Sequence, residues 1–89
     1  MQKTRYLEKI TKGIANHRRI EILALLDRVP ELSVLEVADS LRIDFRTASD
    51  HIRRLAIAGL VMKRNEGRAV RHALTRLGKV ALKFLRTLE

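Results

Sequence analysis

The chain of 89 residues contains no cysteine, no tryptophan and a single proline, and only 3% of its residues are aromatic. The missing cysteines exclude disulfide bonds, thiolate metal sites and thiol redox chemistry. The longest apolar run, from Leu55 to Met62, is far shorter than the roughly 20 residues that span a bilayer, and no signal-peptide stretch follows residues 1–5. We therefore expect a cytoplasmic protein without a membrane partner.

Acidic residues are also scarce, because 10 Asp and Glu stand against 19 Lys and Arg, for a formal net charge of +9. The imbalance is local: the chain up to Ile43 has 8 basic and 6 acidic residues, and the remainder has 11 basic and 4 acidic. Such a surplus is typical of a protein that docks on phosphates, although a basic helix on an anionic membrane or a ribosomal partner would carry the same sign. Charge alone thus favours a nucleic acid.

The composition, 46% hydrophobic and 33% charged, is that of a globular protein rather than of a disordered basic tail. A chain of this length holds one domain, residues 1–89, whose core is close to the smallest that folds without disulfides or metals. A second copy of the chain could supply further burial.

Apolar residues at spacings of three and four predict two helices in the first third of the chain. The segment 17–29 is apolar around most of its circumference, so we expect it to be the central core helix, ended by Pro30. The segment 4–16 is amphipathic, with a single apolar stripe formed by Tyr6, Leu7, Ile10 and Ile14.

Capping residues predict two further helices. Ser33 and Glu36 form a capping-box pattern at the start of a helix that runs to about Leu41. Asp44 can cap a fourth helix, which ends at Gly59 because glycine tolerates the left-handed conformation there. Two helices joined by a tight turn predict a helix-turn-helix.

The pattern then changes to two short strands, 60–64 and 69–74, around a basic turn at 65–68, which predicts a β-hairpin. Thr75 follows as the cap of a last helix, 75–88. The predicted fold class is therefore mainly α with a small β-hairpin (α+β), a winged helix-turn-helix. The last helix carries an apolar stripe that something must cover, made of Leu77, Val80, Ala81, Phe84, Leu85 and Leu88.

The fourth helix, about 44–58, is the candidate DNA-reading element. Ala48, Ile52 and Leu55 recur at helical spacing and should pack inward, which turns the opposite side and the first turn toward a major groove. Arg46 is best placed for a bidentate contact to guanine, while residues further along would contact the backbone. The candidate contacts are Phe45, Arg46, Thr47, Ser49, Asp50, His51, Arg53 and Arg54.

The predicted hairpin, about 63–71, would lie alongside as a wing over phosphates or the minor groove. Plainer interpretations exist: the arginines could be a solvated helix face, Phe45 a core residue, and the hairpin a core cover with charged edges. The order of helix-turn-helix and basic hairpin favours DNA binding, although winged helices also serve as protein-interaction modules. The candidate wing contacts are Lys63, Arg64, Arg68 and Arg71.

Four stretches resemble the ArsR-type winged-helix transcriptional repressors, and are also similar to MarR-like and PadR-like proteins. They match the second helix (13–26), the start of the third (31–38), the recognition helix (47–55) with its exit (58–61), and the wing (66–70 and 74–75). From Gly13 to about Thr75, the resemblance covers about two thirds of the chain. The resemblance implies a homodimer on two half-sites of operator DNA about one helical turn apart. It implies dimerisation through helices 4–16 and 75–88, by Tyr6, Leu7, Ile10, Val80, Ala81, Phe84, Leu85 and Leu88.

The chain departs from the metal-sensing members of that family. Those members carry a pair of thiolates in the third helix. By resemblance, the matching residues of this chain are Ser33 and Leu35, and neither side chain can bind a soft metal. The last helix has no histidine and only Glu89 as a carboxylate, so no metal or cofactor is expected. Asp50 stands where a basic or neutral residue is more usual. An effector or a protein partner remains unidentified.

Enzymatic chemistry is not expected. Ser49, Asp50 and His51 have the residue types of a hydrolase triad, but consecutive helical side chains diverge by about 100° each. His17 and His72 fall in other elements, and the four glycines are isolated, so neither a zinc site nor a phosphate-binding loop is indicated. We predict a nucleoid-associated, dimeric DNA-binding repressor. The alternatives are a winged-helix module for an acidic protein and a sequence-blind architectural DNA-binding protein.

Overall fold

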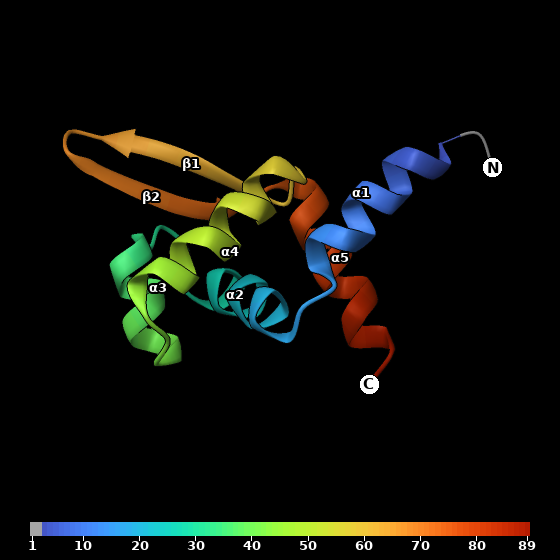
Figure 1. The fold of residues 1–89 in the computed structure, drawn as a ribbon, viewed down its shortest axis with the longest axis horizontal. Helices are drawn as coiled ribbons and strands as arrows, with labels where there is room; N and C mark the ends of the chain where they lie inside the picture. Colours follow the sequence, from blue (N-terminus) through green and yellow to red (C-terminus); the bar gives the residue numbers. More distant parts are fainter. Residues whose placement is uncertain (1–2) are drawn as a thin grey trace.

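The computed structural model describes residues 3–89, which form five helices and one antiparallel hairpin (Figure 1). This arrangement confirms the predicted mainly α fold, with the helix-turn-helix followed directly by the wing. In chain order the elements are α1 (Thr4–Ile14), α2 (His17–Arg28), α3 (Val34–Leu41), α4 (Phe45–Ile57), β1 (Val61–Glu66), β2 (Ala69–Leu74) and α5 (Arg76–Thr87).

The predicted caps start three of the helices. The Ser33 hydroxyl accepts from the backbone N–H of Glu36 at 3.1 Å, and the Glu36 carboxylate accepts from that of Ser33 at 2.9 Å, which completes the capping box of α3. Asp44 caps α4, and the Thr75 hydroxyl caps α5 by accepting from the N–H of Gly78 at 3.0 Å. These short-range bonds satisfy backbone donors that a helix start leaves unpaired.

The first helix is shorter than predicted, since α1 ends at Ile14 rather than at residue 16. Asn16 instead caps α2, with its side-chain oxygen accepting from the backbone N–H groups of Arg18 and Arg19 at 2.9 and 3.4 Å. An extended Asn16 cannot also continue α1, so the two helices are separated by a sharp change of direction.

The hairpin is longer and its turn tighter than predicted. The strands pair without a break from Val61 opposite Leu74 to Glu66 opposite Ala69, which leaves a two-residue turn at 67–68 in place of 65–68. Gly67 has a φ of +62°, the conformation that a two-residue hairpin turn requires at its first central position.

The connection between α2 and α3 pairs with strand β2 of the wing at one position. Leu32 forms an antiparallel bridge with His72, whose backbone N–H donates to the Leu32 carbonyl at 2.9 Å. The His72 ring is buried and its Nδ1 contacts the same carbonyl at 2.8 Å. Glu31, just before this bridge, has a left-handed φ of +71°. The wing is thus tied to the helix-turn-helix at its base.

The core surrounds α2, as predicted for a helix that is apolar on most sides. Ile22 and Leu23 are fully buried in it, and Ala48, Ile52 and Leu55 of α4 pack inward as expected. Leu82, which the apolar stripe of the last helix did not include, is also buried. α5 thus packs on the core through Leu82 and through Ala81 of its stripe, while Phe84 of the same stripe stays exposed.

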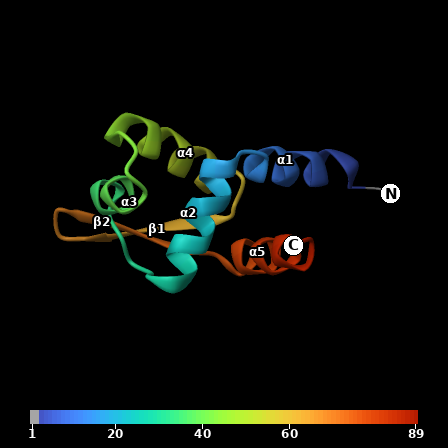
Figure 2. The same ribbon diagram turned by 90° about the horizontal axis from the view of Figure 1, so that it is seen from below.

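Two sides of the molecule can be distinguished in Figure 2, where α1 and α4 lie along one side and the hairpin and α5 along the other. α1 meets α4 at Gly13, which is buried; a Cβ there would lie 2.6 Å from the Cβ of Ala58. Only glycine allows the two helix ends to approach so closely. Within residues 3–89 no helix has both the length and the apolarity needed to cross a membrane.

Candidate nucleic-acid interface

The first turn of α4 presents an exposed aromatic ring and an exposed arginine. Phe45 is 55% exposed, so its alternative interpretation as a core residue that closes the turn is wrong. It lies beside Arg46, for which residues 3–89 supply no ion-pair partner. Together with Ser49, Asp50 and Arg53 they line a shallow hollow of about 390 Å³. This hollow collects five of the eight candidate contacts of α4.

Thr47 is occupied by the helix cap. Its backbone N–H and its hydroxyl donate to the two carboxylate oxygens of Asp44, at 2.8 and 2.7 Å. These hydrogen bonds, from the side chain and then the backbone, hold the pKa of Asp44 below its ordinary value of 3.8. The Thr47 hydroxyl proton is therefore engaged, and only its oxygen is free to accept from a base.

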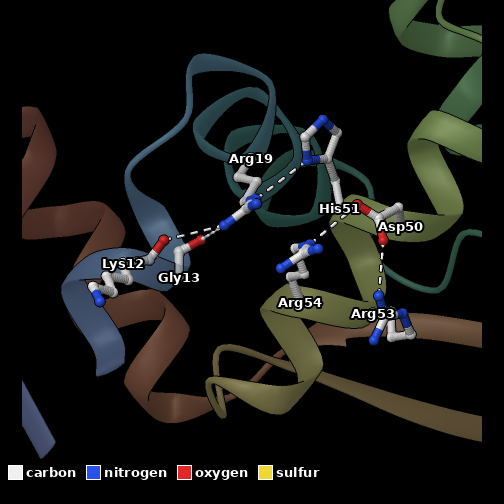
Figure 3. A network of polar contacts seen from close by, with 7 residues as sticks. All are labelled: Lys12, Gly13, Arg19, Asp50, His51, Arg53 and Arg54. Atoms are coloured by element: carbon white, nitrogen blue, oxygen red, sulfur yellow. Dashed lines mark hydrogen bonds and ion pairs between the residues drawn. The ribbon is translucent and has the colours of Figure 1, made fainter. Parts of the chain in front are cut away.

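Asp50 is partnered within its own helix (Figure 3). Its two oxygens accept from Arg53 Nη2 at 2.9 Å and from Arg54 Nε at 3.1 Å, and these bonds lower the pKa of the Asp50 carboxyl. The carboxylate charge is thus offset by two arginines instead of facing an approaching phosphate alone. Because exposed ion pairs contribute little to stability, both guanidinium groups can still turn toward DNA.

His51 faces α2 rather than solvent. Its Nδ1 accepts from Arg19 Nε at 3.2 Å, and burial, followed by the Arg19 charge, lowers the pKa of His51 below 6.5. The ring is therefore neutral near pH 7 and keeps one N–H for a phosphate. Arg19 also donates to the carbonyls of Lys12 and Gly13, at 3.1 and 3.3 Å, so one side chain joins α1, α2 and α4.

The four basic candidates of the wing divide into two pairs. Arg64 is ion-paired with Glu31, and Arg71 donates to the Glu31 carbonyl at 3.0 Å, so both hold the wing to the α2–α3 connection. Lys63 and Arg68 form no ion pair in the described part of the chain. These two are the wing cations that remain available to a phosphate.

The apolar residues of α1 and α5 form a groove of about 470 Å³ on the outside of the fold. Val80 is 57% exposed and Phe84 59% exposed in it, whereas Ala81 is buried on the groove floor. Leu88 is also exposed but does not line the groove. Tyr6 lies exposed on the same helix as Leu7 and Ile10. The candidate dimer residues that line the groove are Leu7, Ile10, Val80, Ala81, Phe84 and Leu85.

Sequence reasoning missed a second basic cluster, in which Lys9, Lys12 and Arg19 lie beside Arg53 and Arg54. The spacing of the two lysines, opposite the apolar stripe of α1, was a visible signal. The contact between the end of α1 and the end of α4, however, leaves no signal in the sequence. No group of three or more histidine, aspartate or glutamate side chains in residues 3–89 is placed to hold a metal ion.

Comparisons with known proteins agree with this geometry, although no protein-family model matches the chain. Reduced HlyU from Vibrio cholerae is 31% identical, with a TM-score of 0.82 over 98% of this chain and 92% of that one. The transcriptional regulator HlyU from Vibrio vulnificus is 33% identical, with a TM-score of 0.78 over 98% and 91%. Both likenesses extend over nearly the whole of each chain.

Two further relatives have descriptions that name a protein family or a regulatory function. The homodimeric winged helix-turn-helix DNA-binding domain Mb0332 from Mycobacterium bovis, described as a possible ArsR-family regulator, is 28% identical with a TM-score of 0.83, over 96% of this chain and 78% of that one. A cadmium resistance transcriptional regulatory protein, a CadC homolog from Staphylococcus aureus, is 33% identical over 66 residues. That match covers 74% of this chain but only 54% of the relative. All four are described as regulators or DNA-binding proteins, or share such a protein's name.

Proposed function

Because the chain belongs to the ArsR family of winged helix-turn-helix transcriptional regulators, a family of regulators rather than enzymes, we propose that it binds double-stranded operator DNA as a homodimer and represses transcription. The single observation that carries the proposal is the N-terminal end of α4. There Arg46 is exposed and unpaired among residues 3–89, while the opposite side of the helix is locked into the core.

In this proposal α4 enters the major groove with its N-terminal end toward the bases. Arg46 donates to the O6 and N7 acceptors of guanine, Ser49 contacts a base or phosphate, and Phe45 touches a thymine methyl. Arg53 and Arg54 contact the backbone and set the register. Their bonds to Asp50 are exposed and weak, so both side chains can exchange them for phosphate contacts when DNA binds.

The wing lies over the neighbouring phosphates or the minor groove. Arg68 at the turn and Lys63 on β1 supply the contacts, since neither is held by an acidic side chain of the described chain. Arg64 and Arg71 do not contact DNA in this proposal but hold the wing in place by their bonds to Glu31. The wing's contribution is electrostatic and carries no base information.

We propose that residues 1–89 form a single domain and that the groove between α1 and α5 is covered by the same groove of a second copy. The exposed apolar side chains of that groove would otherwise stay in water, and a two-fold interface uses one patch on both copies. The dimer then places two α4 helices on half-sites about one helical turn apart. Its place of action is the nucleoid in the cytoplasm, and any effector binds without a thiolate because the chain has no cysteine.

The test compares two duplexes of equal length, the region upstream of the protein's own gene and a scrambled version, by fluorescence anisotropy across a salt series. Arg46→Ala should remove about 1–3 kcal/mol of preference between the duplexes, whereas Arg68→Ala should weaken both alike and reduce the salt slope by about 1 per protomer, about 2 per dimer. Equal losses on both duplexes from both substitutions would contradict the role of Arg46. Absence of binding even at low salt would favour a protein partner instead.

A further inference from the structure

A basic pocket lies where the end of α1 meets the end of α4. It has a volume of about 190 Å³, several times the roughly 30 Å³ that one water occupies in the liquid, so a tetrahedral phosphate group fits inside it. Gly13 and Ala58, which allow the two helices to touch, form part of the lining. Five cations surround the pocket: Lys9 and Lys12 from α1, Arg19 from α2, and Arg53 and Arg54 from α4.

Few acidic groups offset these charges. Asp50 accepts from both arginines of α4, and Glu8 lies 3.7 Å from the Lys12 ammonium in an exposed pair. Lys9 has no ion-pair partner among residues 3–89. Five positive charges against two negative ones leave an excess that attracts an anion.

Unused donors also remain in the pocket. Arg19 uses Nε and Nη1 for His51 and the α1 carbonyls, which leaves its Nη2 group, and Arg54 uses only Nε for Asp50. Each guanidinium carries five N–H donors in one plane, a geometry that matches phosphate oxygens. By covering the carbonyls of Lys12 and Gly13, Arg19 also shields the negative end of the α1 dipole.

The pocket continues the surface that faces DNA in the proposed function. Arg53 lines both this pocket and the hollow that contains Phe45 and Arg46. α1 and α4 also lie along the same side of the molecule (Figure 2). Lys9 and Lys12 lie on α1 away from its apolar stripe, so they stay exposed when the groove is covered.

From this juxtaposition we infer that the pocket of Lys9, Lys12, Arg19, Arg53 and Arg54 binds a phosphate of the DNA backbone beyond the reach of the reading end of α4. The inference rests on the proposed function and extends it to α1, which thereby serves both the dimer and the DNA. The lysines supply mobile charge and the arginines supply fixed donors. The contact adds affinity for every sequence and no preference among sequences.

The decisive variant is Lys9→Gln/Lys12→Gln, and its matched control is Lys79→Gln/Lys83→Gln on α5, which removes the same charge from the other side of the molecule. Glutamine keeps the helix propensity of lysine, so folding should be intact, as circular dichroism would verify. In the salt series the α1 variant should lose about 0.9 of slope per protomer, about 2 per dimer, on operator and scrambled duplex alike. The control variant should lose clearly less.

A second measurement locates the contact, using operator duplexes in which single phosphates are replaced by uncharged methylphosphonates. At least one replacement should weaken wild type and the α5 control more than the α1 variant, because that variant has already lost two of the five cations that surround the phosphate. If every replacement weakens the α1 variant as much as wild type, or if both double variants lose the same slope, the inference is overturned. The proposed function still stands in that case, provided that wild type prefers the operator and Arg46→Ala loses the preference.

Discussion

The apolar groove between α1 and α5 and the basic surface along α4 and the wing differ in how far the chain satisfies them by itself. Val80 and Phe84 remain more than half exposed, whereas Arg53, Arg54, Arg64 and Arg71 are paired with groups of the same chain. Charged side chains can be held by water and by surface ion pairs of small net energy, and then released to a stronger partner. Exposed apolar area has no such substitute, so the groove needs another protein surface at all times and the basic surface needs DNA only transiently.

The largest effect should come from a substitution that disrupts the apolar groove and leaves the basic surface unchanged. Phe84→Glu buries a charge in the centre of the proposed dimer, so gel filtration with light scattering should show a monomer. Without the second subunit, binding to an operator with both half-sites should weaken by about 10²–10⁴-fold, since the second contact is no longer intramolecular. Binding to a single half-site should stay unchanged.

Lys83→Gln is the control for that substitution, because it shifts the charge by the same single unit on the adjacent position of α5, outside the groove. It should remain dimeric. A Phe84→Glu protein that still has the mass of a dimer in light scattering would show that some other surface holds the two copies together.

A smaller effect should follow from disturbing the contact between α1, which forms part of the groove, and α4, which forms part of the basic surface. Gly13→Ala places a Cβ at 2.6 Å from the Cβ of Ala58, so α1 must shift away from α4. We expect a loss of about 1–3 kcal/mol in the free energy of unfolding, measured by urea denaturation, together with weaker dimerisation and weaker DNA binding. The double variant Gly13→Ala/Ala58→Gly removes the clashing atom and should recover much of the stability. Full stability of the single variant would mean that this close approach is not required.

The smallest effect concerns the link between His51 and Arg19. The pKa of His51 is lower in the folded chain than its ordinary value of 6.5, so the unfolded chain binds the proton more readily. Stability from this residue is therefore complete above pH 6.5 and declines as the pH falls through the folded pKa. The carboxyls of Asp44 and Asp50, whose ordinary pKa of 3.8 is also lowered, lose their contribution only below about pH 4.

Urea unfolding at pH 7.5 and 5.5 measures the contribution of His51 without that of the two carboxyls, which stay ionised at both pH values. Wild type should lose more stability between the two values than His51→Gln, and the two proteins should respond alike between pH 7.5 and 8.5. An identical decline in both proteins down to pH 5.5 would show that the pKa of His51 is not lowered by folding.

Much of the fold could be predicted because its signals are local. Ser33, Asp44 and Thr75 each cap a helix through a residue three positions further along, so the helix starts follow from a few neighbouring letters. The inward side of α4 and the exposed Arg46 follow in the same way from helical periodicity. The pairing of Asp50 with Arg53 and Arg54 also lies within one helical turn, and its spacing was available before the structure.

The sequence by itself thus determined the order of helices and hairpin, the basic balance, the apolar stripe of α5 and the residues that α4 turns outward. Only the tertiary structure decided which arginines are already paired, as with Arg64 and Glu31, and that Lys9 and Lys12 line one pocket with the arginines of α4 beside the contact at Gly13. Local signals reflect hydrogen bonds and periodicity over three or four residues, which the chain carries in its letters. Contacts between distant segments depend on the angle and distance at which whole helices pack, and those are set by the volumes of all core side chains together.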